Sequence, residues 1–193
     1  MNKSLGLYNL IDLDGINDSI KRVVSSDVNF NTYVSPKGLK ELRVTIANFL
    51  RDTWNYNGSY KNILITSGSQ QSINLIVYSI INDGDMILVE QPTYFGAIDV
   101  FKNRKLKQVG INIWEDGFNL EELEEKIIEY KVKAIYVTPT FNNPTGYAWS
   151  NEARRAFLDI VNKYDVLVIE DDPYRLINFT DYEYRTLYEM NNG

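Results

Sequence analysis

The sequence contains neither cysteine nor histidine among its 193 residues. Within this chain there is therefore no disulfide, no thiolate nucleophile and no Cys/His zinc site, and no imidazole serves as a base. Proton transfer has to use lysine, tyrosine or a carboxylate, or a bound cofactor has to supply the difficult chemistry. These absences exclude many classes of hydrolase and metalloenzyme.

Long apolar runs and excess basic charge are also lacking. Apolar stretches such as 73–81 and 166–169 are interrupted well before the ~20 residues that a membrane-spanning helix needs. The formal charge of −6 and the pI near 4.8 disfavour a surface that neutralises nucleic-acid phosphates. Residues 1–15 do not resemble a secretory signal. We expect a cytoplasmic protein that binds neither membrane nor nucleic acid through this segment.

The hydrophobic pattern alternates between strand and helix over most of the chain. Strands are predicted at 62–66, 86–90, 106–113, 133–138 and 166–170, and helices at 35–50, 70–81, 94–101, 120–130 and 151–164, the last capped by Ser150. This order predicts an α/β fold, a mainly parallel sheet with helices on both faces. Residues 1–32 are expected to form an irregular N-terminal lead segment, followed by one domain over 33–193.

Three polar loops follow predicted strands, and in open α/β sheets the ligand lies beyond the carboxyl ends of the strands. They are Ser67–Gln70 (SGSQ), Asn142–Gly146 (NNPTG) and Glu170–Tyr174 (EDDPY). The first places N–H groups, a hydroxyl and an amide at a helix N-terminus, which favours a phosphate, although it lacks the nucleotide P-loop and dinucleotide glycine patterns. Each loop alone also fits an ordinary turn or cap. The occurrence of all three loops in one alternating series of strands and helices favours a ligand site.

Together with two further segments, these loops resemble a known family. The motifs are YVSPKG at 33–38 with Leu42-Arg43, SGSQQ at 67–71, EQPTYFG at 90–96, NNPTG at 142–146 and EDDPYR at 170–175. In this order they resemble the fold-type-I enzymes that use pyridoxal 5'-phosphate (PLP), specifically class I/II aminotransferases of the aromatic, 2-aminoadipate and kynurenine branch. The resemblance covers nearly the whole chain and implies an incomplete PLP-binding large domain.

The resemblance implies which residues hold the cofactor phosphate. Gly68 and Ser69 would bind it through their backbone, Ser69 also through its hydroxyl, and Gln70 would assist. Tyr33 would reach the phosphate of the neighbouring subunit, which implies a homodimer with shared sites.

The resemblance also implies the residues around the cofactor ring. Tyr94 would stack on the pyridine ring, and Asn143 and Tyr174 would hydrogen-bond its phenolic oxygen. Asp171 would pair with the pyridine nitrogen and favour its protonated form, so that the ring accepts electrons from the substrate. Asp171 and Tyr94 are therefore the candidate catalytic residues, although Tyr94 also fits a core aromatic.

One family feature is not found in these 193 residues. In this family a lysine in a Ser-x-x-Lys segment follows the Asp171-type residue by a few tens of positions and forms a Schiff base with PLP. No lysine of the chain occupies that position, and Lys37 lies at the start of a helix before the sheet begins. A second basic phosphate ligand and the arginine for the substrate carboxylate are also missing. We therefore expect a fragment of a roughly twofold longer parent, inactive by itself.

Three functions fit these residues. The first is an aminotransferase that exchanges an amino group between an L-amino acid and a 2-oxo acid. The second is the PLP-binding effector domain of a MocR/GntR-type transcriptional regulator, in which a winged helix would precede this segment. The third, ranked below them, is a PLP-dependent lyase or decarboxylase on the same scaffold.

Overall fold

The computed structural model describes residues 11–26, 33 and 35–191, which belong to two compact units, 1–36 and 37–193. The N-terminal unit contains helix α1 (Leu13–Val24), whose first turn is capped by the Asp12 carboxylate, 2.9 Å from the backbone nitrogen of Gly15. The expectation of an irregular lead is wrong over this stretch. Its signal was the Asp12 cap together with apolar residues at helical spacing, at 13, 16, 20, 23 and 24.

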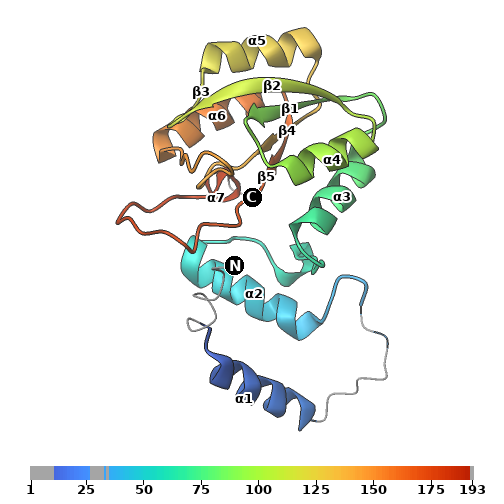
Figure 1. Ribbon diagram of the computed structural model, residues 1–193, viewed down its shortest axis with the longest axis vertical. Helices are drawn as coiled ribbons and strands as arrows, with labels where there is room; N and C mark the ends of the chain where they lie inside the picture. The colour runs from blue at the N-terminus through green and yellow to red at the C-terminus, as the bar shows by residue number, and fades with distance from the viewer. Residues whose placement is uncertain (1–10, 27–32, 34, 192–193) are drawn as a thin grey trace, which may run out of the picture. The chain divides into compact units, whose positions relative to one another are not determined.

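The C-terminal unit is built on a five-stranded sheet in the order β3-β2-β1-β4-β5 (Figure 1). The strands are β1 (Met86–Gln91), β2 (Lys107–Trp114), β3 (Gly117–Phe118), β4 (Ala134–Val137) and β5 (Leu167–Glu170). All neighbours pair in parallel except β3, a two-residue strand antiparallel to β2. The predicted α/β fold with a mainly parallel sheet is confirmed.

Helices cover both faces of this sheet. Those on one face are α3 (Ser69–Ile80) and α4 (Phe95–Asn103), and those on the other are α5 (Leu120–Tyr130), α6 (Asn151–Lys163) and α7 (Leu187–Met190). Helix α2 (Lys40–Trp54) and the 3-10 helix η3 (Tyr60–Asn62) precede them in the chain. Strand side chains alternate between two cores: Ile87 and Val89 pack with α3 and α4, whereas Leu88 packs with α5, α6 and α7. The predicted cap is confirmed, since the Ser150 hydroxyl accepts from Ala153 N at 3.1 Å. Among the described residues, no helix combines the length and apolar character that crossing a bilayer requires.

Two predicted elements differ from the structure before the sheet begins. The helix expected from 35 begins at Lys40, because Gly38 has a left-handed φ of 94° that a helix cannot accommodate. The strand expected at 62–66 is absent from the described chain. Ile63 is extended, but no neighbouring strand pairs with this segment, and the Ile65 N–H donates instead to the Lys37 carbonyl at 3.0 Å.

Strand β5 lies at one edge of the sheet, paired on one side with β4. A groove beside it is lined by residues 166–170 and by Ile76 and Ile80 of α3, and Leu167, Ile76 and Ile80 are exposed. An apolar edge with unpaired backbone groups is a template for pairing with another chain. We expect this edge to drive association of the isolated chain.

Replacing Leu167 by lysine tests this expectation. A charge on the edge strand should lower concentration-dependent association into assemblies larger than a dimer, because pairing would bury it. Light scattering over a concentration series measures the effect. Ile128→Lys, at an exposed apolar position of α5, is the control. Equal suppression by both variants would point to net charge rather than to the β5 edge.

Candidate functional site

The centre of the sheet contains a topological switch point. Strands β1 and β4 are neighbours, but the chain leaves β1 through α4 towards β2 and leaves β4 through α6 towards β5. Such a divergence opens a crevice at the carboxyl ends of the two strands, where ligands of open α/β sheets bind. Of the predicted site residues, Tyr94, Asn143, Asp171 and Tyr174 lie in the segments that follow β1, β4 and β5. Tyr33 belongs to the N-terminal unit, where its side chain is fully exposed.

Asp171 follows the last residue of β5 and makes two hydrogen bonds to residues of β4. Its backbone N–H donates to the Val137 carbonyl at 2.9 Å, and its carboxylate accepts from the Tyr136 hydroxyl at 2.7 Å. Burial raises the pKa of Asp171, the Tyr136 hydrogen bond lowers it, and the charge of Asp172 raises it. Burial and the Asp171 charge raise the pKa of Tyr136, so this hydroxyl stays a donor. Sequence reasoning missed Tyr136, whose one signal was a hydroxyl in an otherwise apolar strand.

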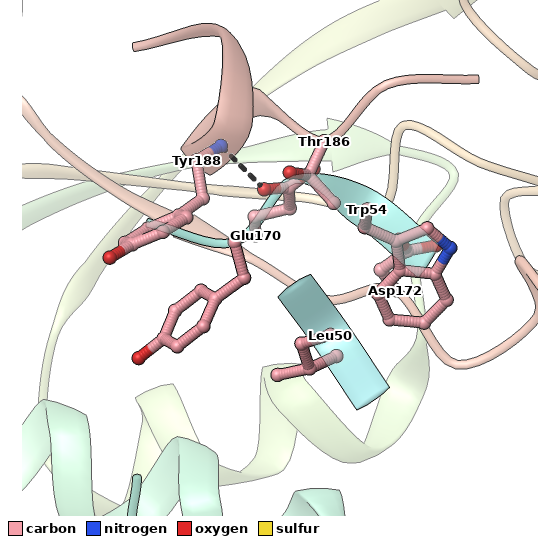
Figure 2. A pocket seen from close by; sticks show the side chains of 7 residues that line it. Leu50, Trp54, Glu170, Asp172, Thr186 and Tyr188 are labelled. Atoms are coloured by element: carbon pink, nitrogen blue, oxygen red, sulfur yellow. Dashed lines mark hydrogen bonds between the residues drawn. The ribbon is translucent and has the colours of Figure 1, made fainter. Parts of the chain in front are cut away.

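The carboxylates on either side of Asp171 bind other parts of the protein. Glu170 accepts from the backbone N–H groups of Leu187 and Tyr188 at 2.8 and 3.1 Å, and Asp172 pairs with Arg175. Both line a cavity of about 260 Å³ (Figure 2), together with Leu50, Trp54, Tyr56, Thr186 and Tyr188. Asp171 does not line this cavity, because successive side chains of an extended segment point in opposite directions. Of the three consecutive carboxylates, Asp171 is therefore the one that points away from this cavity.

Asn143 and Tyr174 come together although 31 residues separate them. The Asn143 amide nitrogen lies 3.4 Å from the Tyr174 hydroxyl. Asn143 belongs to the turn between Asn142 and Gly146, in which the Gly146 N–H donates to the Asn142 carbonyl at 2.6 Å. The structure thus joins the NNPTG and EDDPY loops, which follow β4 and β5.

The SGSQ loop forms the N-terminus of helix α3. Gly68 is the N-cap residue, with φ of 97° and no side-chain hydrogen bond to the first turn. A methyl group added at Gly68 would meet no atom within 4 Å, so the space above this backbone is open. Ser69 and Gln70 begin the helix, where N–H groups favour an anion.

Tyr94 is fixed next to this loop through Gly96. The Gln70 side chain donates to the Gly96 carbonyl at 2.9 Å. The Tyr94 ring lies so close to Gly96 that an added Cβ would come within 2.5 Å of Tyr94 Cζ. The ring is half-buried and packs against the core formed with α3 and α4. Glycine at 96 therefore makes room for the ring in this position.

A second residue that sequence reasoning missed is Glu90, near the end of β1. It is 1% exposed, and one carboxyl oxygen accepts from Thr138 N at 3.0 Å and from the Asn142 amide at 2.7 Å. Burial raises the pKa of Glu90 to about 8, against the lowering effect of these two bonds. Its signal in the sequence was a charged residue at the end of a buried apolar strand.

Comparisons with known proteins agree with the fold. A family model described as "Aminotransferase class I and II" matches residues 3–190. The chain belongs to this family. Aromatic-amino-acid aminotransferase 1 of Thermococcus litoralis is 37% identical over 153 residues, which are 77% of this chain and 37% of that protein.

This aminotransferase-family chain is also similar to a solved structure and to a protein named as a regulator. The crystal structure of Pyrococcus horikoshii kynurenine aminotransferase in complex with PMP is 30% identical, with a TM-score of 0.87 over 94% of this chain and 46% of that one. "Uncharacterized HTH-type transcriptional regulator YdfD" of Bacillus subtilis is 32% identical over 152 residues, 79% of this chain and 31% of that protein. The chain thus spans less than half the length of each of the three.

The contact between Tyr94 and Gly96 predicts a coupling in stability within this family member. Gly96→Ala should lower the free energy of unfolding by about 1 kcal/mol, because the new methyl group displaces the ring. In a Tyr94→Ala background the same change should be neutral or stabilising, since alanine is the better helix residue. Denaturant unfolding of the four variants measures the difference. An equal cost in both backgrounds would show that the ring does not oppose the methyl group.

The buried Glu90 predicts a dependence of stability on pH. Its folded pKa of about 8 lies above the ordinary glutamate value of 4.5, so the folded state favours the protonated carboxyl. Stability is therefore greatest below about pH 4.5 for this group and falls as pH rises towards 8. Denaturant unfolding at pH 5, 6, 7 and 8 should show this fall, and Glu90→Gln should flatten it. A smaller fall in stability with pH should remain in Glu90→Gln, because the pKa values of Asp171 and Glu170 are also raised. An unchanged slope in Glu90→Gln would contradict the prediction.

Proposed function

We propose that this chain is the PLP-binding part of an aminotransferase that transfers an amino group between an L-amino acid and a 2-oxo acid. The observation that carries the proposal is the position of Asp171, bonded to Tyr136 at a switch-point crevice in a chain of this family. The aminotransferase relatives and the PMP complex support it. PMP, pyridoxamine 5'-phosphate, is the amino form of PLP, so PMP and PLP are two states of one cofactor.

The phosphate end of PLP fits the start of α3. Gly68 has no side chain to fill the open space above it, and the helix that begins at Ser69 is 12 residues long. The backbone N–H groups of Gly68, Ser69 and Gln70, with the Ser69 hydroxyl, would bind the phosphate, because N–H groups and the helix dipole attract an anion there.

The ring end of PLP fits the residues that follow β1, β4 and β5. Tyr94, at the start of α4, would stack on the pyridine ring. Asn143 and Tyr174 would donate hydrogen bonds to the phenolic oxygen, and Asp171 would accept one from the pyridine nitrogen.

The chemistry of the site follows from what Asp171 does. When bound, PLP accepts the electron pair released as the Cα–H bond of an amino acid breaks. Asp171 has to be ionised for this, because an adjacent carboxylate favours the protonated pyridine nitrogen. The Tyr136 hydroxyl assists by lowering the pKa of Asp171 against the effect of burial and by orienting the carboxylate. Tyr136 is thus a positioning residue for Asp171.

Three finer points belong to the same proposal. Residues 33–193 are part of a PLP-binding large domain, with 1–32 as a lead segment. Tyr33 would reach the phosphate of the other subunit in a homodimer. The 193 residues by themselves would bind PLP without completing a transfer, because the reaction needs a lysine as the base at Cα. Two of the lysines, for example, are bound elsewhere: Lys126 contacts Gly110 and Glu122, and Lys163 contacts Glu124.

A second candidate is the effector domain of a transcriptional regulator, which the likeness to the Bacillus subtilis regulator favours. The same residues would then bind PLP in order to sense it. Sequencing the gene on both sides of this segment distinguishes the two. An upstream winged helix would support the regulator, and a downstream Ser-x-x-Lys segment without that domain would support the enzyme.

The role of Asp171 is tested by Asp171→Asn in the native protein. The amide keeps an oxygen for Tyr136 but removes the charge, so turnover should fall about 100-fold or more. PLP affinity should stay within about tenfold, because the phosphate contacts are unchanged. A transamination assay and fluorescence titration with PLP measure the two effects, with the exposed Asp159→Asn as control. Turnover close to the unmodified protein would overturn the assigned role.

A further inference from the structure

Glu90 connects the ends of two strands inside the protein. Its Oε2 atom accepts from the Thr138 N–H, just after β4, and from the amide of Asn142 in the turn that follows. These partners lie 48 and 52 residues along the chain. The contact therefore depends on the pairing of β1 with β4 and fixes the following turn relative to the sheet.

Asn142 also makes hydrogen bonds to other residues of the turn. Its side-chain oxygen accepts from the Thr145 backbone and hydroxyl at 3.3 and 2.9 Å. Its backbone N–H donates to the Tyr147 carbonyl at 2.8 Å. Asn142 is itself buried. The backbone of Asn143 is thus held on both sides, and its side chain points at the Tyr174 hydroxyl.

The carboxyl group at 90 is costly for the fold. Its second oxygen, Oε1, is buried without a hydrogen-bond partner among the described residues. Asp171, just after β5, and Tyr136 on β4 act on it electrostatically, and the negative charge of Asp171 opposes ionisation. An apolar side chain of similar size would bury no unpaired oxygen, but it would leave the Thr138 N–H and the Asn142 amide without their acceptor. The carboxyl group thus buries one unpaired oxygen and in return holds the Asn142 turn on the sheet.

We propose that Glu90 is a positioning residue that sets Asn143 at the ligand crevice by clamping Asn142. Glu90 does not touch the ligand. Its effect on ligand binding passes through Asn143, so removal of Asn143 also removes the benefit of Glu90. That the ligand is PLP rests on the proposed function, whereas the coupling between Glu90 and Asn143 does not.

The first experiment is a double-mutant cycle on PLP affinity, measured by fluorescence titration of the 193-residue chain. Glu90→Leu and Asn143→Ala should each weaken binding about tenfold, and the double variant no more than about threefold further. Independent effects would instead multiply to about 100-fold and would overturn the proposal. Glu90→Leu with Ser69→Ala is the control pair, and there the effects should multiply. Glu90→Gln keeps an acceptor for both N–H groups and should bind within about threefold of the unmodified chain.

A second experiment uses no ligand. The side-chain amide resonances of Asn142 and Asn143, followed by ¹⁵N NMR, should both move in Glu90→Leu and stay near their positions in Glu90→Gln. Glu115→Gln, at an exposed glutamate, is the control and should move neither. If Glu90→Leu does not fold, Asn142→Ala breaks the clamp from the other side and replaces it in the binding cycle.

The two experiments separate two failures. Absence of PLP binding by the unmodified chain would contradict the proposed function, and the NMR result would still decide the role of Glu90. An Asn143 resonance that does not respond to Glu90→Leu, or to Asn142→Ala in its place, would overturn the positioning role even if PLP binds.

Discussion

The parallel pairing of β1 with β4 is the constraint on which the site depends. It places Glu90 level with the residues that follow β4, and the pairing of β4 with β5 extends the same edge to Asp171. Residues from three separate parts of the chain meet there because parallel strands end on one side of a sheet. The two cores on either face hold the strands in this register, since a shift by one residue would turn every side chain to the wrong face.

Four carboxyl groups lie at or near this edge of the sheet, and they differ in the partners that stabilise them. Glu170 satisfies the N–H groups at the start of α7, and Asp172 pairs with Arg175. Asp171 has one hydroxyl donor, and Glu90 leaves one oxygen unpaired. Burial raises the pKa of Glu90, Glu170 and Asp171. Perturbed carboxyl pKa values of this kind occur at functional sites and in structural hydrogen-bond networks alike.

The order of elements from 86 onwards could be predicted because apolar periodicity and caps are local. The strand ends of β4 and β5 were placed closely enough to identify the loops that contain Asn143 and Asp171 as ligand candidates, whereas Tyr94 was a candidate through the family resemblance. The start of α2 was missed because the left-handed Gly38 overrides the Ser-Pro signal. The strand predicted at 62–66 does not form, because pairing is a property of two segments and cannot be read from one. Helix α1 had a readable signal in Asp12 and its apolar spacing, which was not used.

The sequence by itself determined the fold class, the family resemblance and the residue types available for chemistry, since these depend on local pattern and on the order of motifs. The tertiary structure decided which of three consecutive carboxylates points away from the cavity at α2, that the Tyr136 hydroxyl donates to it, and that Glu90 holds the Asn142 turn. These contacts join residues 35 to 52 positions apart. Their partners are chosen by strand register and side-chain direction, and neither is encoded within a single motif.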